Sequence, residues 1–133
     1  MSDAAPQQNA VGWFEIYVDD LDRAVAFYET VFDTTLETLD VSGVPGSSLQ
    51  MRAFPMSMEA GGAAGALVKM EGVGPAPGGT LVYFSCADCA VEAARVAAAG
   101  GRVQQEKQSI GPYGHIALAF DTEGNMIGLH SQN

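Results

Sequence analysis

Apolar and polar residues alternate near the start of the chain, in GWFEIYVDD at residues 12–20. A period of two is typical of a β-strand with two different faces. One face would carry three ordinary core residues, Phe14, Ile16 and Val18. The other would carry Trp13, Glu15 and Tyr17, whose polar atoms each need a partner or water. We therefore predict that the second face looks into a cleft.

After this strand the apolar spacing changes to that of a helix. Asp20 is placed to cap the first turn of DDLDRAVAFYETVF, in which Ala24, Phe27, Tyr28 and Val31 would share one apolar face. Three strands are expected next, in TLETLDV, SLQMRAF and ALVKM, separated by the turn VSGVPGS and the loop EAGGAAG. The predicted order is strand, helix, strand, strand, strand.

The same order recurs after the glycine- and proline-rich linker EGVGPAPGG. The strand TLVYFSC leads to CAVEAARVAAAG, a helix capped by Asp88 and ended by Gly100 and Gly101. Strands follow around RVQQEK, HIALAF and MIGLH. Placing Asp20 over Asp88 superimposes the two strand-to-helix units, which indicates an internal repeat.

Two such units bury one face of a shared sheet under their helices and curve the other face around a cavity. We therefore predict an α+β fold in which two paired βαβββ modules form a curved mixed sheet around a cleft. The expected boundaries are a flexible tail at 1–10 and one domain at 11–131, with module one at 11–70, a linker at 71–79 and module two at 80–131.

Alternation also selects the residues of module two that would face the cleft. The core side would take Val82, Phe84, Ile116, Leu118, Phe120, Ile127 and Leu129. The cleft side would take Tyr83, Ser85, His115, Ala117, Ala119, Gly128 and His130. With the first strand, the predicted ligand-binding residues are Trp13, Glu15, Tyr17, Tyr83, Ser85, His115 and His130. The candidates for acid–base catalysis are Glu15, His115 and His130.

Composition narrows the classes of partner. The 133 residues carry 16 acidic and 6 basic side chains, a formal charge of -10, which argues against nucleic acid and anionic membrane surfaces. The chain has no apolar run long enough to cross a bilayer, and its start, MSDAAPQQNA, does not have the pattern of a signal peptide. We expect a cytoplasmic protein.

The two cysteines, Cys86 and Cys89, form a lone CADC motif. A structural zinc site needs two further ligands, which no second cysteine pair provides. We expect both thiols to be reduced and partly buried, with Cys86 on the core side of a strand.

Three stretches resemble the vicinal oxygen chelate superfamily: VDDLDRAVAFYETVF, the opening LVYFSCAD of module two, and DTEGNMIGL near the end. That superfamily contains glyoxalase I, bleomycin-resistance proteins, fosfomycin-resistance enzymes and extradiol dioxygenases. The resemblance covers residues 11–131 and is greatest to glyoxalase-like members of unassigned function. It implies the paired-module fold and a homodimer.

Metal-dependent members of the family place ligands on the first and last strands of each module. By resemblance, the first-strand positions fall at Trp13 and Leu81, and the last-strand position of module two falls at Gly128. ALVKM, the last strand of module one, has no His, Asp, Glu or Cys. The sequence therefore predicts no metal site in the family's manner and no cofactor, although Glu15, His115 and His130 could form a different one.

The favoured hypothesis is a metal-independent protein of the glyoxalase fold that binds a small, partly apolar molecule between its modules, as a binding protein or as a lyase or isomerase. One alternative is a drug-sequestering protein like those for bleomycin, which would need acidic residues around the cleft. A metal-dependent glyoxalase or dioxygenase is a second, and an interaction domain whose cleft is filled by side chains is a third.

Overall fold

The structure is a computed structural model that describes residues 9–45, 48–75 and 79–133. Module one consists of β1 (Val11–Tyr17), α1 (Leu21–Phe32), β2 (Glu37–Thr38), β3 (Gln50–Ala53) and β4 (Ala64–Lys69). Module two consists of β5 (Thr80–Ser85), α2 (Cys89–Val96), β6 (Arg102–Ser109), the short 3-10 helix η1 (Gly111–Tyr113), β7 (His115–Phe120) and β8 (Met126–Ser131). Most of the tail predicted at 1–10, and residues 76–78 of the linker, lie outside the described residues.

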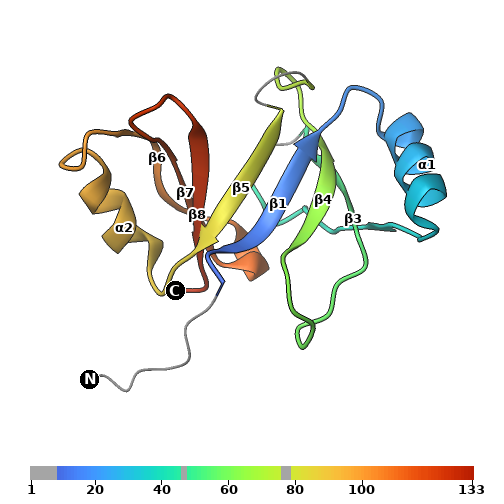
Figure 1. The fold of residues 1–133 in the computed structure, drawn as a ribbon, viewed down its shortest axis with the longest axis horizontal. Coiled ribbons are helices and arrows are strands. Elements are labelled where there is room, and N and C mark those ends of the chain that lie inside the picture. Colours follow the sequence, from blue (N-terminus) through green and yellow to red (C-terminus); the bar gives the residue numbers. More distant parts are fainter. Residues whose placement is uncertain (1–8, 46–47, 76–78) are drawn as a thin grey trace.

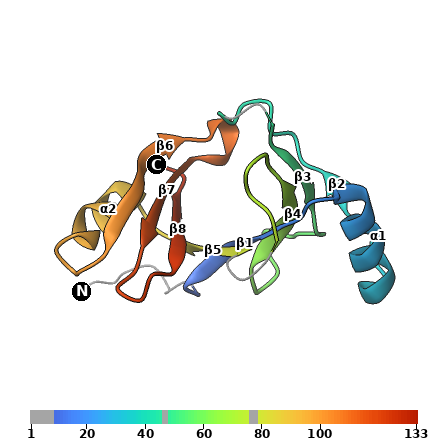
Figure 2. The ribbon, with the colours of Figure 1, turned by 90° about the horizontal axis from the view of Figure 1, so that it is seen from above.

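The eight strands formed by the described residues belong to one mixed sheet, in the order β2-β3-β4-β1-β5-β8-β7-β6. Each module has the same topology, because β1 runs parallel to β4 and β5 runs parallel to β8. The modules join edge to edge within one chain through antiparallel pairing of β1 with β5 (Figure 1). Figure 2 shows that the sheet curves strongly, with the helices at its two ends. The predicted α+β fold of two paired βαβββ modules is confirmed.

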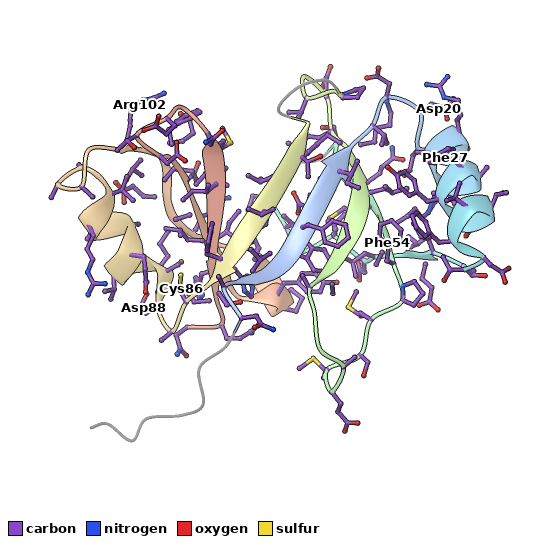
Figure 3. The ribbon with its side chains drawn as sticks, viewed as in Figure 1. Asp20, Phe27, Phe54, Cys86, Asp88 and Arg102 are labelled. Atoms are coloured by element: carbon purple, nitrogen blue, oxygen red, sulfur yellow. The ribbon has the colours of Figure 1, made fainter. Side chains whose placement is uncertain are left out.

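An aspartate caps each helix, as the sequence predicts. Asp20 accepts a hydrogen bond from the backbone N–H of Arg23 at 2.9 Å, and Asp88 accepts one from Ala90 at 3.0 Å. Figure 3 shows these two caps at opposite ends of the sheet. The second helix ends at Val96, earlier than CAVEAARVAAAG suggests, and the chain then turns through Gly100 at a φ of 102°.

In the part of the chain that the structure describes, three hydrophobic clusters hold the fold together. One lies under α1 and is centred on Leu21, Leu36 and Leu67. A second lies under α2 and consists of Cys89, Ala93, Ala117 and Leu129. The third lies on the concave face, where both modules contribute to it: Tyr17, Met51, Ala53, Ala66, Val68, Leu81 and Tyr83. The concave face is therefore largely lined and filled by packed side chains.

The predicted faces of β7 are wrong. Ala117 packs under α2, whereas Ile116 and Leu118 pack against the concave cluster. The physical reason is that both faces of β7 are apolar, so alternation does not decide which face meets α2; in the structure Ala117 packs in one cluster with Ala93 and Leu129. The larger side chains of β7 turn to the opposite face and fill the concave interior.

The strand expected in TLETLDV is also shorter than predicted, since β2 covers only Glu37–Thr38. Leu39 continues the pairing with a single hydrogen bond, from its N–H to the carbonyl of Met51 at 3.1 Å. Leu39 and Val41 then pack against the concave cluster instead of extending the sheet. Among the described residues, no helix is long and apolar enough to cross a membrane.

Candidate functional site

Glu15 lies in the middle of β1, on the concave face of the sheet. Its carboxylate accepts a hydrogen bond at each oxygen: from the Tyr17 hydroxyl to Oε1 at 2.5 Å and from the Trp13 indole Nε1 to Oε2 at 3.1 Å. All three side chains come from one strand and share a face because they are two residues apart. The carboxylate is thus held in one orientation by two neutral donors.

Burial raises the pKa of Glu15 above its ordinary value, because a charged carboxylate loses water in this position. The hydrogen bonds from Tyr17 and Trp13 act in the opposite direction and offset part of that rise. Burial, followed by the negative charge of Glu15, raises the pKa values of Tyr17 and Tyr83. Both phenols are therefore neutral at physiological pH and can donate hydrogen bonds.

Small side chains flank Glu15 on one side. Its neighbour in β4 is Ala66, and the next residue across, in β3, is Ala53. On the other side it pairs with Leu81 in β5. The carboxylate therefore has small and medium apolar side chains in the strands on both sides of it.

The Tyr83 ring covers Gly128, its partner in the neighbouring strand β8. A Cβ added at Gly128 would lie 2.2 Å from Cδ1 of Tyr83, far inside van der Waals contact. Only glycine fits beneath this ring. The position that the family resemblance gives to a metal ligand in module two is thus closed by an aromatic side chain.

Ser85 and His130 lie side by side in β5 and β8. The ring Nε2 of His130 is 2.7 Å from the carbonyl oxygen of Tyr113, to which it donates as the Nε2–H tautomer. Glu15 pairs with Leu81 in β5, four positions from Ser85, which corresponds to roughly 13 Å along the strand. Glu15 and His130 share the concave face but are not in hydrogen-bond reach of one another.

His115 lies on the other face of the sheet, contrary to the prediction. Its strand partner is Ser131, whose hydroxyl accepts from the N–H of Cys89 at the start of α2. Its Nδ1 is 3.2 Å from the carbonyl oxygen of Gln132. Of the seven predicted site residues, the structure places Trp13, Glu15, Tyr17 and Tyr83 together, with Ser85 and His130 further along the same face.

The residues at the family's ligand positions do not suit a metal ion. Trp13 and Leu81 have no donor for a divalent cation, and Gly128 has no side chain. In the described ranges, no group of three His, Cys, Asp or Glu side chains is arranged to hold a metal. Glu15 itself uses both oxygens for bonds to Trp13 and Tyr17.

The acidic residues that would favour drug sequestration lie away from the concave face. Asp19, Asp20 and Asp22 gather around the start of α1, beside Lys69. Glu29 accepts a hydrogen bond from the N–H of Leu36 beyond the end of α1, and Glu37 is exposed on the edge strand β2. This distribution does not favour an acidic groove for a cationic drug.

Both cysteines are free and lie at the start of α2, of which Cys89 is the first residue. Cys89 is buried, and Cys86 is partly buried on the side that packs under the helix. Burial, with a contribution from the charge of Glu92, raises the pKa of the Cys86 thiol to about 11. A thiol in this state is a poor nucleophile near neutral pH.

Sequence reasoning missed the contacts that cover the concave face. Leu39 and Val41 pack onto the cluster from module one, and the Tyr113 hydroxyl donates to the carbonyl of Asp40 at 2.6 Å. The only signal is the motif GPYG at residues 111–114, which marks a turn but does not identify its partner.

The chain is similar to known proteins in sequence and in fold. Residues 10–129 match the model of the Glyoxalase/Bleomycin resistance protein/Dioxygenase superfamily. Over 120 residues, or 88% of the chain, 33% are identical to proteins named "Putative glyoxylase CFP32" from Mycobacterium bovis and Mycobacterium tuberculosis. The chain spans 42% of the length of these relatives.

Similar solved structures include two methylmalonyl-CoA epimerases. A variant of the Streptomyces coelicolor enzyme, in complex with 2-nitronate-propionyl-CoA, has a TM-score of 0.64 and 19% identity, covering 94% of this chain and 95% of that one. The Mycobacterium tuberculosis enzyme has a TM-score of 0.65 and 16% identity, covering 93% and 88%. At these identities the likeness establishes a shared fold.

Proposed function

The chain belongs to the Glyoxalase/Bleomycin resistance protein/Dioxygenase superfamily, and from that premise we propose that it binds a small, partly apolar molecule on its concave face. In the proposed reaction, Glu15 acts as a general base without a metal ion. The class is a lyase or isomerase acting on a carbonyl compound with an acidic C–H bond. The observation that carries the proposal is the Glu15 carboxylate, desolvated and fixed by two neutral donors.

The hydrogen bonds to Glu15 leave it able to accept a proton. A carboxylate has about four lone-pair positions, and Tyr17 and Trp13 occupy two of them. Partial desolvation raises the pKa toward neutrality, where a base is most effective. A general base typically contributes about 10²–10⁴-fold to a rate.

In the proposed step, Glu15 removes the proton from the carbon next to the substrate carbonyl. The electron pair of that C–H bond moves into the carbonyl group and forms an enolate. The neutral hydroxyl of Tyr83, whose pKa is raised, is the nearby group that could donate to the enolate oxygen. Return of a proton to carbon completes an isomerisation, and loss of a leaving group at the next carbon completes an elimination.

The structural neighbours support this class of reaction by analogy. Methylmalonyl-CoA epimerase, as its name says, inverts a carbon centre, and the present chain shares its fold. Fold alone does not carry substrate identity from one protein to another. We therefore extend to this chain the class of enolisable carbonyl substrate and take methylmalonyl-CoA, the compound bound in one neighbour, as its probe.

Metal independence is part of the proposal and rests on the residues in place. Relatives that use a metal need several donor side chains converging on one point, and Trp13, Leu81 and Gly128 provide none. Loss of its ligands weakens a metal site severely. In the proposed reaction Glu15 therefore acts together with the neutral phenols around it, and without a metal ion.

A homodimer is also proposed, and the outer surface of α1 supports it. Phe27, Val31 and Phe32 are 59%, 54% and 63% exposed, although they are large apolar side chains. They flank Tyr28, whose ring stacks on Phe32 and meets Phe54 edge-on at 5.7 Å (Figure 3 labels Phe27 and Phe54). An apolar surface of this kind is typical of an interaction site. A second copy of the chain would cover it.

The proposed site can be tested by ligand-dependent thermal stability. We expect methylmalonyl-CoA, added to protein dialysed against EDTA, to raise the melting temperature of the wild type. Ligand at a hundred times its dissociation constant stabilises by about 2.7 kcal/mol. Glu15→Gln should lose most of this rise, while Glu37→Gln, an exposed matched control, should keep it. Equal shifts in the two variants would contradict a role for Glu15.

A further inference from the structure

Two segments, one from each module, meet above the concave face. The Tyr113 hydroxyl of η1 donates to the carbonyl oxygen of Asp40 at 2.6 Å. Next to this bond, a Cβ built at Gly43 would lie 3.3 Å from Cδ of Pro112. In Figure 2 these segments meet opposite the central strands β1 and β5, so that the curved sheet is closed into a ring.

The module-one segment covers the cluster that contains Glu15's neighbours. Leu39 and Val41 pack against the concave cluster, as Trp13 does. From the other module, Ile116 and Leu118 pack against the same cluster. A molecule that enters over the sheet toward Glu15 therefore meets the side chains of this segment.

The two halves of the contact are anchored very differently. Tyr113 is tied to its own module, because its carbonyl accepts from Nε2 of His130 at 2.7 Å and from Nε2 of Gln132 at 3.4 Å. The turn is also closed by the N–H of Ile110 bonding the Gly114 carbonyl at 2.8 Å. The η1 side is thus the fixed half.

The module-one half is bonded mainly to itself. The N–H of Val44 bonds the Val41 carbonyl at 3.0 Å, and the N–H of Ser42 bonds the Asp40 carboxylate at 3.0 Å. Among residues 39–45, all of which the structure describes, Leu39 has the backbone bond to β3, from its N–H to the carbonyl of Met51 at 3.1 Å. Residues 40–44 therefore form a compact turn held by its own hydrogen bonds.

We propose that residues 40–44 are a lid over the concave site and that Tyr113 is its latch. In the closed state Val41 occupies space beside the cluster, and breaking the bond from Tyr113 to Asp40 lets the turn lift and expose Trp13 and Glu15. The ligand part of this inference rests on the proposed function, whereas the lid motion does not. It also gives His130 a positioning role, since that ring holds the latch.

The lid further defines the ligand's chemistry. A bound molecule that displaces Val41 has to replace the contacts of that side chain with the cluster. It therefore carries an apolar portion that faces the lid and an enolisable carbonyl that faces Glu15. A small, fully hydrophilic metabolite would leave the apolar cluster exposed to water.

Hydrogen exchange tests the latch without any ligand. Tyr113→Phe removes the hydroxyl and keeps the ring. Because a single hydrogen bond contributes about 0.5–1.5 kcal/mol, amide exchange in residues 39–45 should become about two- to tenfold faster. Tyr28→Phe, which removes a hydroxyl under α1, is the matched control and should leave this segment unchanged. Unchanged exchange in Tyr113→Phe would overturn the latch.

The fluorescence of Trp13, the single tryptophan of the chain, tests whether the lid covers the site. Acrylamide should quench Trp13 about twofold more strongly in Tyr113→Phe than in the wild type, and equally in Tyr28→Phe. Faster exchange of the lid with unchanged quenching would show that residues 40–44 move without guarding the site, and would overturn the proposal.

A covalent lock provides an independent arm if Tyr113→Phe does not fold. The paired substitutions Gly43→Cys and Pro112→Cys place two thiols across the contact. Oxidation should lower both lid exchange and Trp13 quenching relative to the same protein after reduction. Identical values in the two redox states would contradict the lid. None of these readings depends on catalysis, so failure of the proposed function would leave them interpretable.

Discussion

Replacing Glu15 by glutamine should change how stability depends on pH. Burial raises the pKa of Glu15 in the folded protein, so the folded state holds this proton to higher pH than the unfolded state does. The protonated Glu15 contributes its full stabilisation to the wild type below the ordinary glutamate pKa of about 4.3. This contribution is lost as the pH rises through the pKa of Glu15 in the folded protein. Glutamine cannot titrate, so the variant should not show this loss.

The size of the effect follows from the linkage relation. Each unit by which the pKa is raised costs the wild type about 1.4 kcal/mol once the carboxylate is charged. For a domain of this size, 1 kcal/mol corresponds to about 3–5 °C in melting temperature. The amide can accept from only one of Tyr17 and Trp13, which adds a penalty of about 1 kcal/mol that does not vary with pH. The informative quantity is therefore the change with pH in the difference between the melting temperatures of the two proteins.

The assay is thermal unfolding of both proteins at intervals from pH 4 to pH 8. We expect the melting temperature of Glu15→Gln to rise relative to that of the wild type across this range, by about 3–5 °C for each kcal/mol that the charged carboxylate costs. Glu37→Gln removes one negative charge from an exposed position and controls for the lower net charge. A difference that stays constant, or that moves in favour of the wild type as pH rises, would refute the burial of a charged carboxylate at this site.

Three further predictions concern the surrounding structure. Gly128→Ala should lower the melting temperature, with a cost of about 1–3 kcal/mol, because the Tyr83 ring occupies the added methyl's place, and a neutral result would show that the ring moves freely. Asp88→Asn should destabilise the protein in thermal unfolding at pH 7 and by less as the pH falls below the ordinary aspartate pKa, because the hydrogen bond from Lys107, followed by that from the Ala90 N–H, lowers the pKa of Asp88 and its stabilisation is lost on protonation. A destabilisation that grows as the pH falls would contradict this. Iodoacetamide at pH 8 should label Cys86 far more slowly in the native protein than in urea, since the pKa of the Cys86 thiol is about 11. Mass spectrometry measures the labelling, and equal rates in the two conditions would contradict the burial of Cys86.

The sequence predicts the fold well because its strongest signals are local. Asp20 and Asp88 each precede a run of apolar residues at helical spacing, and each caps a helix in the structure. The mixed face of GWFEIYVDD likewise identifies Trp13, Glu15 and Tyr17 as one cluster, because indole, carboxylate and phenol on one face need one another. Hydrogen bonds join them in the structure.

Alternation fails at HIALAF for a reason that lies outside the strand. Both of its faces are apolar, so the pattern fixes two faces but not which one looks inward. Packing in three dimensions decides the matter: Ala117 joins Leu129 in the cluster under α2, and Ile116 packs against the concave cluster. His115 follows the small residues to the outer face and leaves the predicted site.

The covering segment is beyond sequence reasoning for a different reason. The bond from Tyr113 to Asp40 joins residues 73 positions apart, in different modules. No periodicity or motif in the sequence indicates that these two residues are in contact. The same holds for His130, whose bond to the Tyr113 carbonyl depends on where η1 lies once the sheet has curved.

Exchange of a substrate's carbon-bound hydrogen with solvent is the most direct test of Glu15 as a metal-independent base. The metal-free protein should be incubated with methylmalonyl-CoA in D₂O, and deuterium at the carbon between the two carbonyls followed by mass spectrometry. We predict incorporation faster than in the protein-free solution, unaffected by EDTA, and slowed about 10²–10⁴-fold in Glu15→Gln. No incorporation above the protein-free rate, equal incorporation by Glu15→Gln, or incorporation only after a divalent metal is added would contradict it.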